Sequence, residues 1–336
     1  MTFHIKLKDS PYAFEVEEGE TILEGALRQG VDIPFSCQSG ACSTCKGKVI
    51  SGSFNYGGFP ITGIDPDNDQ NDALFCCAFP SSDMEISLAT DSNEYPPAQD
   101  FTCKILNKQN LGAQMMLIRL QPLQNMRFRA GQYLEVKTPD KNYPLSLANA
   151  PDNPYVEIHL QILPAQAYSE TLLKHLTEHT QIQVYGPLGE AYLREDSQKP
   201  LILVAGGSGF APIKSILERL FTQGSKREVH LYWGVRHPGL LYLNDTVEKW
   251  SKLLPSFKYI PVISEPCQEW QGRCGLVHHA VLEDFSDLSG YEAYLAGPFA
   301  MSYAARTDFS QRGMPTTSMY SDAFAFERPL NDNIIS

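Results

Sequence analysis

Four cysteines have a spacing that is typical of metal ligands. Cys37, Cys42 and Cys45 lie in one loop as C-x4-C-x2-C, and Cys76 follows after thirty intervening residues. This is the plant-type spacing of the thiolates that bind a [2Fe–2S] cluster. The residues around the first three ligands are small, which lets the loop backbone approach the inorganic sulfides and donate N–H bonds to them: Ser39, Gly40, Ala41 and Ser43. We therefore predict a [2Fe–2S] cluster on these four thiolates.

Two alternatives to this cluster are a structural zinc site and a group of buried, unligated cysteines. Zinc sites usually pair their ligands in two short knuckles, whereas three of the ligands here share one loop and the fourth stands alone. Cys77 follows Cys76 directly and could compete with it as the fourth ligand. We interpret the remaining cysteines as packed or unligated thiols, as buried cysteine usually is: Cys77, Cys103, Cys267 and Cys274.

Length and charge narrow the class of protein. The 336 residues exceed a single ordinary core, so two or three domains are expected. A net charge of -12 argues against a nucleic-acid partner and an anionic membrane surface, and favours a basic protein partner. No apolar run approaches the roughly 20 residues that cross a bilayer, and residues 1–10 lack the apolar stretch of a signal peptide. We expect a cytoplasmic protein whose cysteines are not in disulfides.

Residues 1–91 are predicted to form one small domain with a ββα opening. Apolar residues share one face of its helix, and glycine- and proline-rich turns separate its strands. Residues 92–100 are polar and contain a Pro-Pro pair, so we predict a linker there. The elements expected before the linker are strands at Phe3–Lys8, Phe14–Val16, Gly47–Ile50 and Met84–Leu88, and a helix at Thr21–Gln29.

The next two segments, 101–199 and 200–328, differ in pattern. Short strands broken by turns fill the first, which favours a small antiparallel barrel. Strands and helices alternate in the second, which favours a parallel sheet with crossover helices. Residues 329–336 are predicted to be a tail. The expected elements include strands at Met115–Leu120, Tyr133–Lys137, Val156–Leu163 and Gln181–Val184, and helices at Ser169–His175 and Leu243–Leu253.

A glycine turn follows the first strand of the second segment. The string LILVAGGSGFAP sets Gly206, Gly207 and Gly209 between an apolar strand and a helix that begins near Ala211-Pro212. Glycine admits a tight turn and the close approach of a pyrophosphate, and the free N–H groups of a helix N-terminus favour anions. Such a turn is weak evidence alone, because glycine turns join many strands to helices.

In order along the chain, these motifs resemble those of the NAD(P)H-dependent iron–sulfur flavoprotein reductases. The family includes the reductase components of aromatic-ring dioxygenases and multicomponent monooxygenases. It also includes the reductases that act with the dehydrase of 3,6-dideoxyhexose synthesis, which resemble the chain most. The resemblance covers about residues 3–326 and rests on AGQY (130–133), LSLANAP (145–151), GPLG (186–189), AGGSGFAP (205–212), YWGVR (232–236), GLVHHAVLEDF (275–285), AGPFAM (296–301) and YSDAF (320–324).

The resemblance implies a fold and an electron path. The expected fold class is α+β and α/β multidomain, with a β-grasp ferredoxin domain, an antiparallel flavin-binding β-barrel and a parallel-sheet nucleotide-binding α/β domain. NADH or NADPH would pass a hydride to FAD, and the [2Fe–2S] cluster would carry single electrons to a partner oxygenase or dehydrase. The Leu-x-Cys pattern of the family favours Cys76 over Cys77 as the fourth ligand.

The resemblance also implies roles for single residues. Ser146 would hydrogen-bond near the flavin N5, and Phe324, or in second place Phe326, would cover the flavin ring until nicotinamide displaces it. The alternative is that both phenylalanines are ordinary core aromatics near the chain terminus. The full set implied to bind cofactors is Tyr143, Leu145, Ser146, Ser169, Gly206, Gly207, Ser208, Gly209, Arg236, Gly297, Pro298 and Phe324. Arg236 would contact the ribose or a 2′-phosphate, or else be a surface arginine.

The chain departs from the family pattern at two places in the barrel segment. The family's Arg-x-Tyr-Ser, which supplies a cation to the flavin pyrophosphate and a ring beside the isoalloxazine, is here Tyr143-Pro144-Leu145-Ser146. The family's His-x-Arg is here His159-Leu160-Gln161. Two lost charge-assisted hydrogen bonds would weaken flavin binding by about two to four powers of ten. The alternative function is therefore a one-electron [2Fe–2S] carrier whose flavin site has degenerated. The acceptor, the choice between NADH and NADPH, and the oligomeric state stay open.

Two histidine pairs have spacings that metal sites use. His175 and His179 stand at i and i+4, without the glutamate that follows the first histidine in metalloprotease helices, and we interpret them as part of a solvated helix face. His278 and His279 are interpreted as local packing at a helix start.

Overall fold

The computed structural model describes residues 2–8, 12–31, 33–35, 38–41, 45–59, 61–64, 71–88, 97–112, 114–162, 167–265 and 270–325. The chain forms two compact units. The first contains Met1–Asn93 and Asp322–Ser336, and the second contains Glu94–Ser321.

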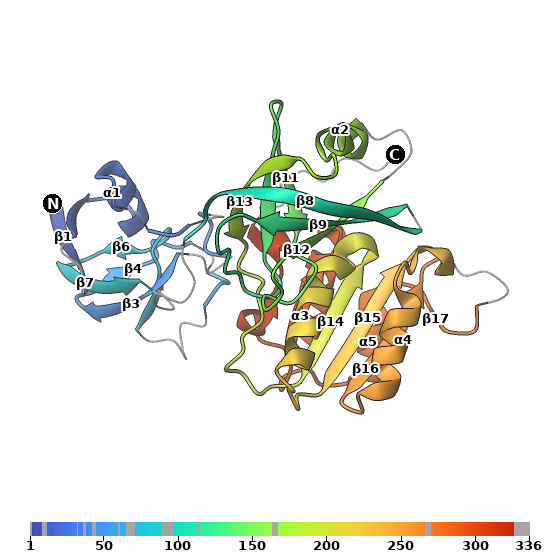
Figure 1. Cartoon of the computed structure of the whole chain (residues 1–336). Helices are drawn as coiled ribbons and strands as arrows, with labels where there is room; N and C mark the ends of the chain where they lie inside the picture. Colours follow the sequence, from blue (N-terminus) through green and yellow to red (C-terminus); the bar gives the residue numbers. More distant parts are fainter. Residues whose placement is uncertain are drawn as a thin grey trace. The chain divides into compact units, whose positions relative to one another are not determined.

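The first unit is a mixed five-stranded sheet covered by one helix (Figure 1). The strand order is β2-β1-β7-β3-β5, and β1 and β7 are parallel while the other pairs are antiparallel. This arrangement of a helix over a sheet with a central parallel pair is the predicted β-grasp. The elements are β1 (Thr2–Leu7), β2 (Ala13–Glu17), α1 (Ile22–Arg28), β3 (Lys46–Ser51), β5 (Asp72–Leu74) and β7 (Met84–Leu88), with a small pair β4 (Phe54–Asn55) and β6 (Phe79–Pro80).

Helix α1 begins one residue after the predicted start, because Thr21 is its N-cap. Thr21 caps the helix: its hydroxyl accepts from the Glu24 N–H at 3.2 Å, and the Glu24 carboxylate accepts from the Thr21 N–H at 2.8 Å. This reciprocal pair satisfies two backbone donors that the first turn would leave exposed. Ile22, Leu23 and Ala26 are buried, so the apolar face of α1 packs into the core of the first unit.

In the second unit, the strands β8 to β13 form an antiparallel barrel, as predicted (Figure 1). The strand order is β11-β10-β13-β8-β9-β12, and an antiparallel bridge between Leu147 and Ile158 joins the two ends of this sheet. This bridge closes the barrel at one point, while the ladder of β11 is with β10. Its elements are β8 (Gln99–Gly112), β9 (Met115–Pro122), β10 (Tyr133–Lys137), β11 (Asn142–Ser146), β12 (Val156–Gln161), α2 (Ala167–His175) and β13 (Gln181–Leu188).

The remainder of the second unit is a parallel sheet with helices on both faces. The strand order is β17-β16-β15-β14-β18-β19, all parallel. Helices α3 and α4 pack on the sheet face that carries Trp233, while the Tyr232 hydroxyl donates to Asp284 of α5 on the other. The elements are β14 (Leu201–Gly206), α3 (Phe210–Thr222), β15 (Val229–Val235), α4 (Asn244–Leu253), β16 (Phe257–Ile263), β17 (Arg273–Cys274), α5 (Val277–Asp284), β18 (Glu292–Ala296), α6 (Phe299–Gln311) and β19 (Met319–Tyr320), with short 3-10 turns η1 (Gly207–Gly209), η2 (Pro238–Leu240) and η3 (Thr316–Ser318). A further 3-10 turn, η4 (Asp322–Ala325), belongs to the first unit.

Some predicted boundaries were wrong. Strand β8 begins at Gln99, so the predicted linker includes two residues that pair with β13. Strand β11 was not predicted, because it contains Pro144. Proline is tolerated there since β11 is the terminal strand of the ladder and pairs with β10. Helix α2 ends at His175, and His179 has a φ of 64°, so this histidine pair does not share a helix face.

Candidate functional site

Two of the four predicted cluster ligands lie in the described residues, and the fold brings them together. Cys45 immediately precedes β3 and Cys76 follows β5, and these two strands pair at Lys46 and Leu74. The backbone N–H of Cys76 lies 3.4 Å from the Cys45 Sγ, and the two residues are 3% and 6% exposed. Their thiols therefore lie at one buried place, as a shared cluster requires. Cys37 and Cys42 lie outside the described residues.

The loop beside these thiols fits a bound cluster. Gly40 has a φ of 75°, and a Cβ at this position would lie 2.8 Å from Ile61 Cδ1 and 3.2 Å from Cys77 Sγ. Only glycine meets both conditions, so the backbone passes close to the thiol group. Cys77 is fully buried with its Sγ 3.5 Å from that of Cys76. Among the described cysteines none is in a disulfide. This donor set of buried thiols beside a tight loop suits a [2Fe–2S] cluster.

Cys103 matches its predicted role as a packed thiol. It is 0% exposed in the barrel core, and burial raises the pKa of its thiol to about 12. A thiol that stays protonated at neutral pH is a poor metal ligand and a poor nucleophile.

The predicted nucleotide-binding residues gather at one edge of the parallel sheet. β14 lies between β15 and β18, and the chain leaves β14 toward β15, so the order of the strands reverses between β14 and β18. Gly206 ends β14, Gly297 and Pro298 follow β18, and the exposed Arg236 follows β15. In open parallel sheets the ligand site lies at the carboxyl ends of the strands where the order reverses.

The three glycines of the turn are required for different physical reasons. A Cβ on Gly209 would lie 2.1 Å from the Ala296 carbonyl oxygen, and a Cβ on Gly206 would lie 2.7 Å from Met301 Sδ. Both are therefore required by packing between the turn and the segment after β18. Gly207 differs, because its φ is 55° and a Cβ there would have no neighbour within 4 Å. It leaves open space above the turn where a pyrophosphate could approach the backbone.

A chain of aromatic contacts holds the turn in position. The Trp233 indole N–H donates to the Gly207 carbonyl at 3.0 Å, and the Trp233 ring stacks on Phe210 at a centroid distance of 4.0 Å. Tyr242 packs edge-on against both rings, and its hydroxyl lies 3.0 Å from His159 Nδ1 on β12 of the barrel. The turn is thereby connected to the barrel through contacts that sequence reasoning missed.

A buried polar network lies beside this aromatic chain. Lys214 Nζ of α3 lies 3.0 Å from Glu157 Oε1 and 2.7 Å from Glu218 Oε1, and His159 Nε2 lies 3.2 Å from Glu157 Oε1. Burial opposes ionisation of Glu157, but the hydrogen bond from His159 and the charge of Lys214 outweigh it and lower the pKa of Glu157 to about 2. Burial also lowers the pKa of His159. An uncharged ring then donates to Glu157 and accepts from Tyr242.

The predicted flavin contacts of β11 face two ways. Tyr143 and Leu145 are 1% and 8% exposed and belong to the barrel core, whereas Ser146 is half-buried. Tyr133 on β10 pairs directly with Ser146, so the two side chains lie on the same face of the sheet, and Tyr133 is also half-buried. Leu188 pairs with Tyr133 from the other side. Ser146 and Tyr133 are thus residues that fit a flavin here, and Tyr133 was missed by sequence reasoning.

The last two predicted residues are buried. Ser169 lies in α2 and is 2% exposed, and Phe324 lies in η4 and is 5% exposed. Phe326 lies outside the described residues. The roles of Ser169 and Phe324 toward a flavin stay predictions.

Two family models match the chain. Residues 5–81 match the 2Fe-2S iron-sulfur cluster binding domain, and residues 203–307 match the oxidoreductase NAD-binding domain. A reductase of CDP-6-deoxy-L-threo-D-glycero-4-hexulose-3-dehydrase from Yersinia pestis is 33% identical over 96% of this chain and 99% of its own. The DmpP reductase component of phenol 2-monooxygenase from Pseudomonas sp. strain CF600 is 32% identical over 96% and 95%.

Solved structures agree with these matches. The crystal structure of the Amycolatopsis cytochrome P450 reductase GcoB has a TM-score of 0.68 at 30% identity, and covers 96% of this chain and 98% of its own. The chain belongs to the NAD(P)H-dependent iron–sulfur flavoprotein reductases. The predicted family, fold class and cofactors are therefore confirmed: it is an oxidoreductase that uses NAD(P)H, FAD and a [2Fe–2S] cluster.

Membership of this family assigns the chemistry of the sites. FAD, when bound, takes two electrons as hydride and releases them singly, which is what a one-electron cluster requires. In the described part of the chain, no helix is both long and apolar enough to span a membrane.

Proposed function

We propose that this reductase delivers electrons from NAD(P)H to a separate acceptor protein, either an oxygenase component or a deoxysugar dehydrase. The observation that carries the proposal is the pairing, in one chain, of a buried thiol site at Cys45 and Cys76 with a nucleotide turn at the reversal point of a parallel sheet. A cluster in the same chain as a hydride site is useful only when electrons leave one at a time. The relatives named as reductases of a hexulose dehydrase and of a phenol monooxygenase support both kinds of acceptor.

Each residue of the sheet edge has a proposed role. The backbone N–H groups of η1 and of the first turn of α3 bind the cofactor pyrophosphate, with Ser208 adding a hydroxyl. Gly297 and Pro298 line the other side of this site, and Arg236 binds the ribose or a 2′-phosphate. The aromatic contact of Trp233 with the turn fixes the direction of these N–H groups.

The barrel contributes the flavin contacts in this proposal. Ser146 donates its hydroxyl near the flavin N5, and Phe324 covers the ring before nicotinamide arrives. We infer that Tyr133, beside Ser146, supplies the flanking aromatic ring that Leu145 does not. Tyr143, Leu145 and Ser169 keep their predicted places in the flavin site, with Tyr143 and Leu145 supporting it from within the barrel core.

One observation favours the second candidate, a one-electron carrier with a degenerated flavin site. Tyr143 and Leu145 stand where the family pattern has an arginine and a tyrosine, and both are buried in the barrel core. They offer the flavin neither a cation nor an exposed ring. The reductase reading is favoured over this one because the nucleotide turn is intact, including the open backbone at Gly207.

The visible absorption spectrum separates the two functions. The purified protein is reconstituted anaerobically with iron, sulfide and FAD, and spectra are recorded before and after addition of NADH or of NADPH. Bleaching of both the flavin and the iron–sulfur bands is expected for the reductase. Iron–sulfur bands that neither nucleotide changes would contradict the proposal and leave the carrier. The nucleotide that bleaches the bands at lower concentration identifies the donor.

The acceptor is tested by its charge. With a net charge of -12, the reductase should meet a basic surface on the acceptor, and the association rate should fall as salt rises. Electron transfer to a purified hexulose dehydrase and to a purified oxygenase component is measured by stopped flow at several salt concentrations. A rate that salt does not change would contradict electrostatic steering.

A further inference from the structure

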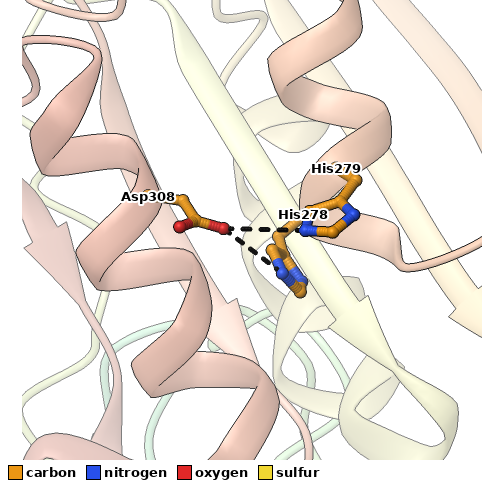
Figure 2. A group of neighbouring side chains, drawn as sticks. All are labelled: His278, His279 and Asp308. Atoms are coloured by element: carbon orange, nitrogen blue, oxygen red, sulfur yellow. Dashed lines mark ion pairs between the residues drawn. The ribbon is translucent and has the colours of Figure 1, made fainter.

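A group of two imidazoles and one carboxylate lies between α5 and α6, apart from the residues assigned to the cofactors. His278 and His279 come from the first turn of α5, and Asp308 comes from α6. His278 Nε2 lies 3.4 Å and His279 Nε2 lies 3.9 Å from the same oxygen, Asp308 Oδ2 (Figure 2). One ligand atom from each residue lies within 4.8 Å of the other two. The histidine pair thus has a third partner thirty residues further along the chain.

The charges around this group leave the carboxylate without an ordinary counterion. Within the described ranges, Asp308 forms ion pairs with these two histidines and with no lysine or arginine. His278 is 5% exposed, and among the described residues its Nδ1 has no hydrogen-bond partner. No hydrogen bond at Nδ1 therefore competes with the contact between His278 Nε2 and Asp308. A partly buried carboxylate facing two imidazoles is satisfied by a divalent cation.

The spacing of the three side chains suits zinc. Zinc binds imidazole nitrogen at about 2.0–2.1 Å and carboxylate oxygen at about 2.0–2.2 Å, so two ligands of a tetrahedral site stand about 3.4 Å apart. The pair His278 and Asp308 already has that separation. The pair at 3.9 Å needs a shift of about half an ångström, and the two histidine nitrogens, which lie within 4.8 Å of each other, must also come to about 3.4 Å. The His279 side chain is 57% exposed and can turn to make both adjustments.

We propose that His278, His279 and Asp308 form a Zn²⁺ site that links α5 to α6, with its fourth position open to solvent water. Three nitrogen and oxygen ligands and one water are the ligand set of an open zinc site. The ion would fasten α6, whose N-terminus follows Gly297 and Pro298, to α5 on the same face of the sheet. The site is independent of the cluster cysteines and of the nucleotide turn.

The test measures Zn²⁺ uptake by the complete protein. Untagged protein loaded with its cluster and FAD is titrated with ZnCl2 by isothermal calorimetry, in a Cys274→Ser background because Cys274 is an exposed thiol. The variants are Asp308→Asn and His279→Gln. The matched control is His179→Gln, an exposed histidine outside the group. Cluster and flavin absorbance report whether each variant keeps its fold.

Binding of one Zn²⁺ per chain, weakened at least tenfold by Asp308→Asn and by His279→Gln but not by His179→Gln, is the expected result, because loss of even an outer partner costs about 10- to 100-fold in metal affinity. Equal affinity in all four proteins, or no uptake by the parent, would overturn the site and leave an ion pair only. If Asp308→Asn loses its flavin and cluster, His279→Gln decides alone, since that side chain is mostly exposed.

Discussion

Replacement of Gly209 by alanine should specifically damage nucleotide binding. The added Cβ would lie 2.1 Å from the Ala296 carbonyl oxygen and 2.7 Å from the Gly297 nitrogen, both of them backbone atoms that cannot rotate away. The turn after β14 and the segment after β18 must therefore separate by about 1 Å, and overpacking of this kind costs about 1–3 kcal/mol. If the whole of this cost reduces the free energy of nucleotide binding, the KM for NAD(P)H rises about 5- to 150-fold.

The assay is steady-state reduction of ferricyanide, with NAD(P)H varied and with flavin and cluster content measured for each protein. The matched control is Gly290→Ala. Gly290 precedes β18, is exposed, and has open space where alanine would place its Cβ. We expect the control to keep the parent KM and thermal midpoint. If Gly209→Ala also keeps both, the close packing of the two segments does not support the cofactor site and the argument from Gly209 fails.

Three further predictions concern the cluster, the turn and the polar network. Cys76→Ser should lose most of the bound iron and sulfide, while Cys77→Ser should keep them, and iron analysis with visible spectra checks this; the reverse result would make Cys77 the ligand. Trp233→Phe keeps the ring but loses the 3.0 Å bond to Gly207, so the KM for NAD(P)H should rise about two- to twelve-fold, for a hydrogen bond worth about 0.5–1.5 kcal/mol; an unchanged KM counts against a positioning role. Because the pKa of Glu157 is lowered from 4.5 to about 2, its contribution to stability is present above pH 4.5 and is lost as pH falls toward 2. The midpoint of thermal unfolding, followed by tryptophan fluorescence, should therefore fall less over that range in Glu157→Gln than in the parent, and parallel curves would contradict it.

Local chemistry made much of this protein predictable. The cysteine spacing, the apolar face of the helix near Ile22 and the glycine turn after an apolar strand each act within a few residues, and each led to the correct element or cofactor. The alternation of strands and helices after Pro200 likewise led to a parallel sheet, because crossover helices are the ordinary connection between parallel strands.

Contacts between distant residues were not predictable. Nothing near Gly209 in the sequence indicates that Ala296 lies against it, so its glycine was attributed to cofactor approach when packing requires it. Tyr133 was read as an ordinary strand residue because only the register of β10 with β11 brings it beside Ser146. The pair His278 and His279 was interpreted as packing because Asp308 lies on another helix.

The network of Lys214, Glu157 and His159 has a practical consequence for dividing the chain. A cut at the predicted boundary between residues 199 and 200 would leave Glu157 and His159 in one fragment and Lys214 in the other. Each fragment would expose charged side chains that are buried in the intact second unit. The C-terminal fragment would also expose the rings of Tyr242 and Phe210, and the N-terminal fragment would expose the surface of β12 at His159. Work on the reductase half therefore needs residues 94–321 kept undivided, together with Phe324 for its proposed flavin contact. Swapping the nucleotide-binding half between related reductases would succeed only when α3 and β12 are exchanged together.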